Sequence, residues 1–107
     1  MDSNETISVS DNSAMSRYEV HVDGGLAGFA EYVRSGRRIN FPHTVVEQQF
    51  GGRGFAGRMA AKALDAARAE QLLVSPQCSF FERYIATHPE YQDIVDPQFR
   101  TAAGGAN

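Results

Sequence analysis

The sequence is poor in cysteine, in long apolar runs and in net charge, and each scarcity excludes a class of protein. The single thiol rules out a disulfide framework or a thiolate metal cluster, and it favours a reducing compartment. No apolar run reaches the roughly 18 residues of a membrane-spanning helix. The first five residues lack the basic start and apolar stretch of a signal peptide. We therefore expect a cytoplasmic protein that does not enter a membrane.

The charge is small and unevenly placed. Ten Lys and Arg stand against thirteen Asp and Glu, giving a net charge of −3 and a pI near 5.5. A general nucleic-acid binder needs a net basic surface, so no nucleic-acid partner is expected. His, Asp and Glu are not clustered at ligand spacing, so no metal site is expected either. An anionic ligand would have to be held by local groups.

The length allows one domain. Residues 1–16 are rich in Ser, Asn and Asp, carry the excess acid and predict a disordered acidic tail. Residues 101–107 predict a flexible C-terminal tail. Between them, residues 17–100 form the predicted domain of about 85 residues, near the lower limit for a self-sufficient core.

Alternating apolar residues predict strands at 18–22, 29–34 and 38–46, joined by short turns into an antiparallel meander. In the third strand the pattern places Ile39, Phe41, His43 and Val45 on one face. Pro42 cannot donate a backbone hydrogen bond, so this strand must lie at an edge or contain a bulge there.

After the third strand, the spacing of the apolar residues changes to the period of a helix. Residues 55–70 predict a helix that buries Phe55, Met59, Ala63, Leu64 and Ala67. A short apolar strand at 72–74 follows, parallel to the third strand, and Ser79 is expected to cap a second helix that ends at residue 87. A short helical turn starts at Pro89. The fold class is therefore α+β, with helices packed on a sheet.

A glycine loop joins the third strand to the first helix. Gly51, Gly52, Gly54 and Gly57 lie within seven residues. Glycines let a ligand approach the backbone, and a helix start offers free N–H groups and the positive end of its dipole. Arg53 and Arg58 add positive charge. The loop predicts a phosphate site, although a simple flexible connection is the alternative.

Two common phosphate-binding patterns fail here. The spacing of Gly52, Gly54 and Gly57 matches a dinucleotide-binding loop, but residues 75–77, after the next strand, provide no acid for a ribose. The spacing of a P-loop is also present, yet Arg58 and Met59 stand where Lys and Ser or Thr would bind phosphate and magnesium.

A third pattern fits better. The loop of the GNAT acetyltransferases reads Gln/Arg-x-x-Gly-x-Gly/Ala, and residues 51–56 match it except that Gly51 occupies the first position. The neighbouring motifs are His43-Thr44-x-Val46, Cys78-x-Phe80, Tyr84-Ile85 and His88-Pro89-Glu90-Tyr91. With these motifs, most of residues 17–96 resembles the small GNAT-like N-acetyltransferase domain family.

The resemblance implies a minimal GNAT-like fold, in which an antiparallel meander is followed by a parallel β-α-β unit and C-terminal helices. It implies acetyl-CoA as co-substrate, with its pyrophosphate on the loop amides. The positions expected to contact CoA are Val45, Val46, Gly52, Arg53, Gly54, Phe55, Ala56, Gly57 and Arg58. The acceptor amine is not implied. Because the chain lacks N-terminal helices that could wall a pocket, we expect a protein amine or a site completed by a partner.

Three residues are candidates for the chemistry. Cys78 lies at a helix start, which lowers the pKa of a thiol and favours the thiolate. Three roles remain open for it: a nucleophile, the acid that protonates the departing CoA, or a small buried hydrophobic residue. His43 is a structural residue or the base that deprotonates the amine. Tyr84, in a position similar to the helix tyrosine of larger GNAT enzymes, is a core residue or an acid.

The leading hypothesis is an acetyl-CoA-dependent N-acetyltransferase that transfers the acetyl group directly in a ternary complex. The alternative is a CoA- or acyl-CoA-binding sensor or interaction module with little turnover, which needs the loop but not the three catalytic candidates. A small structural α+β domain is the third possibility.

Overall fold

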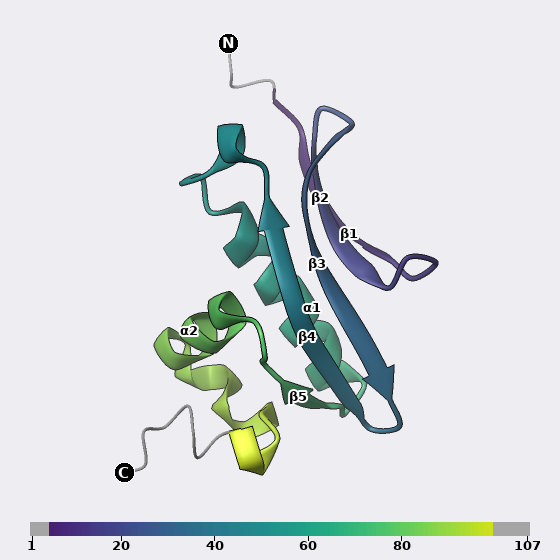
Figure 1. Ribbon diagram of the computed structural model, residues 1–107, viewed down its shortest axis with the longest axis vertical. Helices are drawn as coiled ribbons and strands as arrows, with labels where there is room; N and C mark the ends of the chain where they lie inside the picture. Colours follow the sequence, from purple (N-terminus) through teal and green to yellow (C-terminus); the bar gives the residue numbers. More distant parts are fainter. Residues whose placement is uncertain (1–4, 100–107) are drawn as a thin grey trace.

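A computed structural model describes residues 5–99, and a five-stranded sheet with one long helix makes up most of it (Figure 1). The elements in chain order are β1 Ile7–Asn12, β2 Arg17–Val22, β3 Gly25–Ser35, β4 Arg38–Val46, the 3-10 turn η2 Gln48–Phe50, α1 Phe55–Ala69, β5 Leu73–Ser75, α2 Ser79–Thr87 and the 3-10 helix η3 Pro89–Ile94. The strands lie in sequence order. The first four are antiparallel, and β5 is parallel to β4. The predicted α+β class is confirmed.

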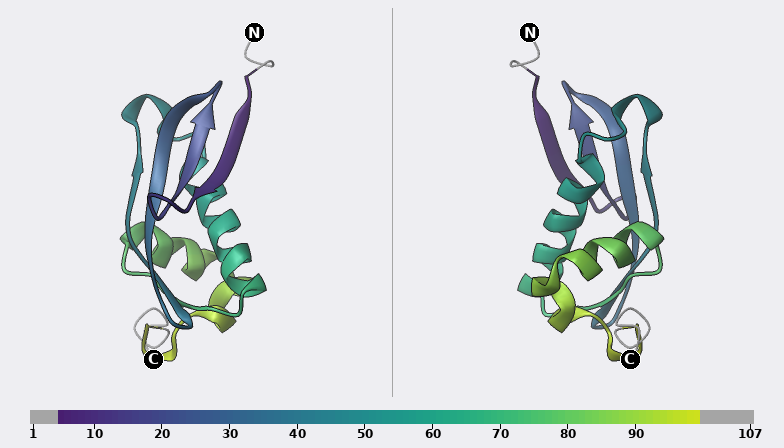
Figure 2. Two further views of the ribbon diagram at one scale, coloured as in Figure 1. Left: turned by 90° about the vertical axis from the view of Figure 1, so that its right-hand side faces the viewer. Right: turned by 90° about the vertical axis from the view of Figure 1, so that its left-hand side faces the viewer.

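The hydrophobic core lies between α1 and one face of the sheet. The predicted apolar face of α1 is buried, with Met59 and Leu64 fully inaccessible. It packs with buried strand residues such as Val20 and Ala30. Figure 2 shows α1 on this side of the sheet, whereas no helix of the described residues lies on the opposite face of the meander. The molecule is therefore a two-layer structure with one open face.

The expected disordered tail is wrong for the part of it that the structure describes. Residues Ile7–Asn12 form β1, which pairs with β2 along its whole length. The partly buried Ile7 and Val9 pack against the core, and Asp11 accepts a hydrogen bond of 2.7 Å from the Tyr32 hydroxyl. The acidic residues of this segment thus belong to the domain. Residues 1–4 and 100–107, which include the expected C-terminal tail, lie outside the described residues.

The prediction that Ile39, Phe41, His43 and Val45 share one face of β4 is also wrong, because a bulge shifts the alternation of its side chains. Glu31 pairs with His43, but Val33 pairs with Asn40, so Phe41 and Pro42 both stand opposite Tyr32. The extra residue turns His43 and Val45 to the face opposite Ile39 and Phe41, and His43 is exposed. The sequence predicts either an edge or a bulge at Pro42; the structure has a bulge there, and the bulge changes which side chains enter the core.

The start of α2 differs from the prediction by one residue. Cys78, not Ser79, is the N-cap, and no side chain caps the helix. The backbone N–H of Glu82 donates to the Cys78 carbonyl at 3.1 Å, which closes the first turn. The helix itself spans the predicted residues Ser79–Thr87.

Candidate functional site

The glycine loop leaves the N-terminus of α1 uncapped. Gly54 is the N-cap with φ of 80°, and Gly52 has the same φ. This left-handed region is unfavourable for residues with a side chain. No side chain caps the first turn, and the turn contains no acid. The first amides of α1 therefore remain available to an anion, with the helix dipole favouring negative charge.

The two arginines of the loop are placed differently. The Arg53 guanidinium forms an ion pair with Glu5, and it lies over the Phe55 ring at 4.9 Å and the Phe50 ring at 6.0 Å. The Arg58 side chain is exposed and makes no hydrogen bond or ion pair within residues 5–99, while its backbone N–H donates to the Gly54 carbonyl at 3.1 Å. Arg58 is therefore ready for an anionic ligand, whereas Arg53 already holds a carboxylate. Nothing local in the sequence links positions 5 and 53, so sequence patterns alone do not reveal this role of Glu5.

Beside the loop, β4 has an open edge. β5 pairs only with the first part of β4, from Arg38 to Asn40, and the two strands then separate. The Cys78 amide donates to the Phe41 carbonyl at 2.8 Å, just beyond the last pair. From Pro42 to Val46 no strand formed by residues 5–99 covers this edge of β4, so its backbone groups are available to an extended ligand. Val45 and Val46, the predicted donors, lie in this segment.

Cys78 faces the open edge from one side. Its half-buried thiol donates to the Thr44 hydroxyl oxygen at 3.4 Å. Thr44 pairs with the buried Ala30, so the contact lies on the same face of the sheet as α1. Thr44 belongs to one of the motifs that resemble the family, but the sequence analysis assigns no role to it.

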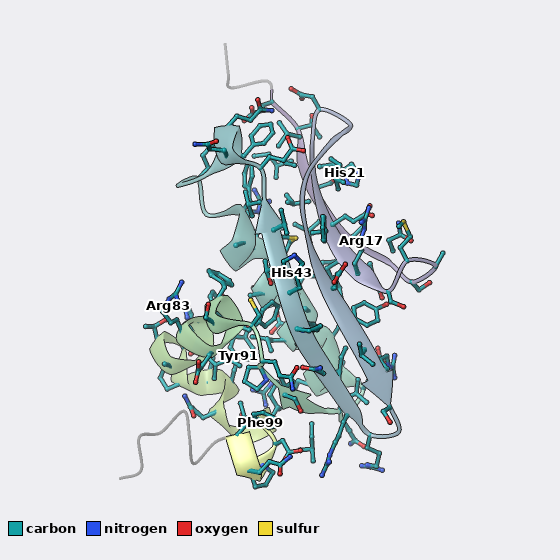
Figure 3. All side chains as sticks on the ribbon, in the orientation of Figure 1. Arg17, His21, His43, Arg83, Tyr91 and Phe99 are labelled. Atoms are coloured by element: carbon teal, nitrogen blue, oxygen red, sulfur yellow. The ribbon has the colours of Figure 1, made fainter. Side chains whose placement is uncertain are left out.

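His43 lies on the other face of β4. Its ring contacts Phe29 edge-on, with centroids 6.3 Å apart, and it is accessible from the open face of the sheet (Figure 3). The structure therefore does not bring His43 and Cys78 together on one face. The two flank the same stretch of β4 from opposite sides.

Tyr84 joins α2 to the helix start at the loop. A Cβ on Gly57 would lie 3.5 Å from its ring, an ordinary van der Waals distance, so the ring lies beside the first turn of α1. Its ring also stacks on His88 at 3.8 Å, and the His88 ring nitrogen bonds to the Tyr84 carbonyl oxygen at 2.7 Å. Burial, followed by the charges of Glu90 and Asp65, raises the pKa of Tyr84, so the phenol is protonated at neutral pH.

Two open hollows in the described chain lie away from these residues. One, of about 450 Å³, lies between β1, β2 and the C-terminal half of α1, and is lined by Asp11, Tyr18, Lys62, Asp65, Ala66 and Glu70. The other, of about 510 Å³, lies around Tyr32 and the turn after β1. Neither contains a predicted site residue.

No three His, Cys, Asp or Glu side chains within residues 5–99 are grouped so that they could hold a metal ion. Among the helices of this segment, none is both long and apolar enough to span a membrane.

The chain is a small α+β domain that can hold an anionic ligand. Four features define it: an antiparallel meander, a glycine turn, a helix with an uncapped N-terminus, and a short strand parallel to β4 that separates from it. The model of the GCN5-related N-acetyl-transferase family matches residues 17–94, and the chain belongs to this family. The predicted resemblance is confirmed. The match begins at β2, so β1 lies outside it. Family members use acetyl-CoA as co-substrate. A search of curated proteins gives no match.

Proposed function

We propose that the protein is an acetyl-CoA-dependent N-acetyltransferase that transfers the acetyl group directly to an amine in a ternary complex. The observation that carries this proposal is the uncapped, acid-free start of α1, which follows the open edge of β4. A polyphosphate and an extended acyl arm need these two features together. The family to which the chain belongs supports the same chemistry.

The loop is the proposed phosphate site. The amides of Arg53, Gly54, Ala56 and Gly57 would hold the pyrophosphate, because they surround a helix start without a cap. The neighbouring positions Gly52, Phe55 and Arg58 complete this proposed site. The Arg53 side chain can contribute only after it leaves Glu5.

The reaction requires two proton movements. The amine nitrogen attacks the thioester carbonyl carbon, the new C–N bond forms, and the C–S bond breaks. His43 is the proposed base for the proton that leaves the amine, since its ring is exposed beside the open edge. Tyr84 or Cys78 is the proposed acid for the departing thiolate. The amides near Val45 and Val46 are the proposed donors to the oxyanion.

Cys78 also allows a second route. Its sulfur could accept the acetyl group first and pass it to the amine, which would leave a transient acetyl-cysteine. The contact with Thr44 holds the thiol toward β4, so the same geometry serves either role. Intact mass measured after incubation with acetyl-CoA distinguishes them, because only the covalent route adds an acetyl group that disappears in Cys78→Ser.

Calorimetric titration with acetyl-CoA and with CoA tests the proposal first. We expect both to bind, and acetyl-CoA to be consumed when an amine is added. Absence of binding at high micromolar ligand would reject the proposal. Binding without acetyl transfer to any amine would identify the alternative, a CoA- or acyl-CoA-binding module with little turnover.

A further inference from the structure

The hollow between β1, β2 and the C-terminal half of α1 is separate from the candidate site. Its volume is about 450 Å³, and its lining residues include none from the glycine loop or the open edge of β4. Both views of Figure 2 show the end of β1 beside α1. β1, which forms one wall, precedes residue 17, where the family match begins. The proposed acetyl transfer therefore leaves this hollow unused.

A buried tyrosine lines this hollow with an unpaired hydroxyl. Tyr18 is only 5% exposed, and its ring packs against that of Tyr32 with centroids 5.6 Å apart. The Tyr18 hydroxyl makes no hydrogen bond within residues 5–99, whereas the hydroxyls of Tyr32 and Tyr91 each donate to a carboxylate. Buried polar groups nearly always have hydrogen-bond partners, so this hydroxyl points to a partner from outside the described chain.

The other two tyrosines hold two carboxylates of the hollow in place. Asp11 Oδ1 accepts a hydrogen bond from Tyr32 at 2.7 Å, and Asp65 Oδ1 accepts one from Tyr91 at 2.8 Å. The second oxygen of each carboxylate makes no hydrogen bond within residues 5–99. These two acceptors are therefore already ordered, which lowers the entropic cost of binding a ligand.

The hollow also contains two hydrogen-bond donors that lack an acceptor. Burial, followed by the charges of Asp11 and Glu70, raises the pKa of Tyr18 to about 12, so its hydroxyl is a donor at neutral pH. The exposed Lys62 ammonium makes no ion pair or hydrogen bond within the described residues. A carboxylate on a ligand would pair with both groups at once.

The charges around the hollow leave one negative charge in excess. Three carboxylates line it, those of Asp11, Asp65 and Glu70. Lys62 is the one lining cation, and Arg34 pairs with Glu70 at 3.0 Å as a second. Arg68, on the next turn of α1, is paired with Asp93 and adds no net charge. Three negative against two positive charges favour a ligand with a net charge of +1.

We propose that this hollow binds a free basic α-amino acid such as arginine. Its carboxylate pairs with Lys62 and accepts a hydrogen bond from the Tyr18 hydroxyl, and its two cationic groups pair with the three carboxylates. A simple amine would leave both donors unsatisfied, and a simple anion would meet the three carboxylates. The bound amino acid is not the acceptor of the acetyl group, because none of the proposed reacting residues lines the hollow.

NMR titration of the full-length protein with L-arginine, without acetyl-CoA, tests the site. Because the hollow is open and the ligand small, we expect a Kd of about 1 mM, with the largest amide shifts around Asp11 and Ala66. Agmatine lacks only the carboxylate and should bind at least about fivefold more weakly, since Lys62 then meets a cation without a compensating anion. L-citrulline, whose side chain is uncharged, should also bind more weakly.

Two variants separate the contacts of the ligand. Tyr18→Phe and Lys62→Gln should each weaken arginine binding about fivefold, and Lys62→Gln should leave agmatine binding unchanged or tighter. Arg83→Gln is the matched control for the loss of one exposed cation, since Arg83 lies on α2 and does not line the hollow. Thermal unfolding shows whether Tyr18→Phe keeps its fold, and Lys62→Gln changes only an exposed side chain.

The remaining outcomes overturn the inference. Absence of shifts at about ten times the expected Kd would show that the hydroxyl is only hydrated. Equal affinities for agmatine and arginine would assign the hollow to simple cations. Unchanged arginine affinity in both variants would place the ligand elsewhere. Failure of the protein to bind acetyl-CoA would reject the proposed function and leave this site standing, because the titration needs no acetyl-CoA.

Discussion

At the scale of single residues, the backbone of Gly54 ties the loop's geometry to its proposed ligand. Its φ of 80° is one that L-residues rarely adopt, and nothing lies within 4 Å of the position of a Cβ. A side chain there would meet no protein atom. It would instead project from a loop whose amides are proposed to touch a phosphate.

Replacing Gly54 with alanine should therefore affect ligand binding more than the fold. We expect a loss of about 1 kcal/mol in stability from the left-handed φ. Acetyl-CoA binding, measured by calorimetry, should weaken at least tenfold because the methyl group obstructs the backbone. Gly36→Ala is the control, since Gly36 has φ of 61° and equally open surroundings in the turn that precedes β4, whereas the loop follows the other end of β4. Equal affinities in the two variants would show that the phosphate lies elsewhere.

At the scale of elements, the segment before β1 is attached to the loop. Thr6 and Asp23 exchange hydrogen bonds, the Thr6 amide donating to the carboxylate at 2.9 Å and the Asp23 amide to the Thr6 carbonyl at 2.8 Å. This fixes the chain where Glu5 reaches Arg53. The Glu5 carboxylate therefore pairs with Arg53, a residue that would otherwise be available to a bound phosphate.

Removing that carboxylate should strengthen acetyl-CoA binding. In Glu5→Gln we expect the Kd to fall about threefold at low salt, since an exposed pair contributes up to about 1 kcal/mol, and the gain should shrink as salt screens the charges. Glu47→Gln, also exposed and near the loop, controls for the general loss of one acid. If both variants gain equally, the local pair with Arg53 does not compete with the ligand.

At the scale of the whole molecule, buried tyrosines connect the helix layer, the sheet and β1. Tyr32 donates to Asp11 of β1 at 2.7 Å, and Tyr91 of η3 donates to Asp65 of α1 at 2.8 Å. Tyr18 stacks obliquely on Tyr32, with centroids 5.6 Å apart. Burial is the largest cause that raises the pKa of all three to about 12.

The raised pKa values of these three tyrosines predict that the protein loses stability in alkali. The ordinary tyrosine pKa is 10.0, so the unfolded chain releases these protons at lower pH than the folded chain does. The free energy of unfolding should be unaffected by them below pH 10 and should fall as the pH rises from 10 toward 12. Denaturant titrations at several pH values measure this decline.

Tyr91→Phe supplies the control for this decline. It should cost about 1 kcal/mol at neutral pH, because the hydrogen bond to Asp65 is lost, and it should make the alkaline decline shallower. A stability that stays constant up to pH 12 would contradict the assignment.

Much of the fold could be read from local patterns. Alternation defined β2, β3 and β4, and the period of 3.6 residues defined α1 and its buried face, because each pattern reflects which side chains leave water together. The glycines and the motifs after them identified the loop and the family without any knowledge of tertiary contacts.

Other features depend on residues far apart in the chain, and only the tertiary structure decided them. β1 gains its order from pairing with β2 and from Tyr32, so its polar sequence alone suggested a tail. The bulge at Pro42 reversed the side on which His43 lies, since one inserted residue exchanges the two faces of a strand. Likewise, the loop residue Arg53 forms an ion pair with Glu5, from the start of the described chain. Sequence periodicity fixes which side chains leave water together, whereas register and long-range pairing decide which charges meet.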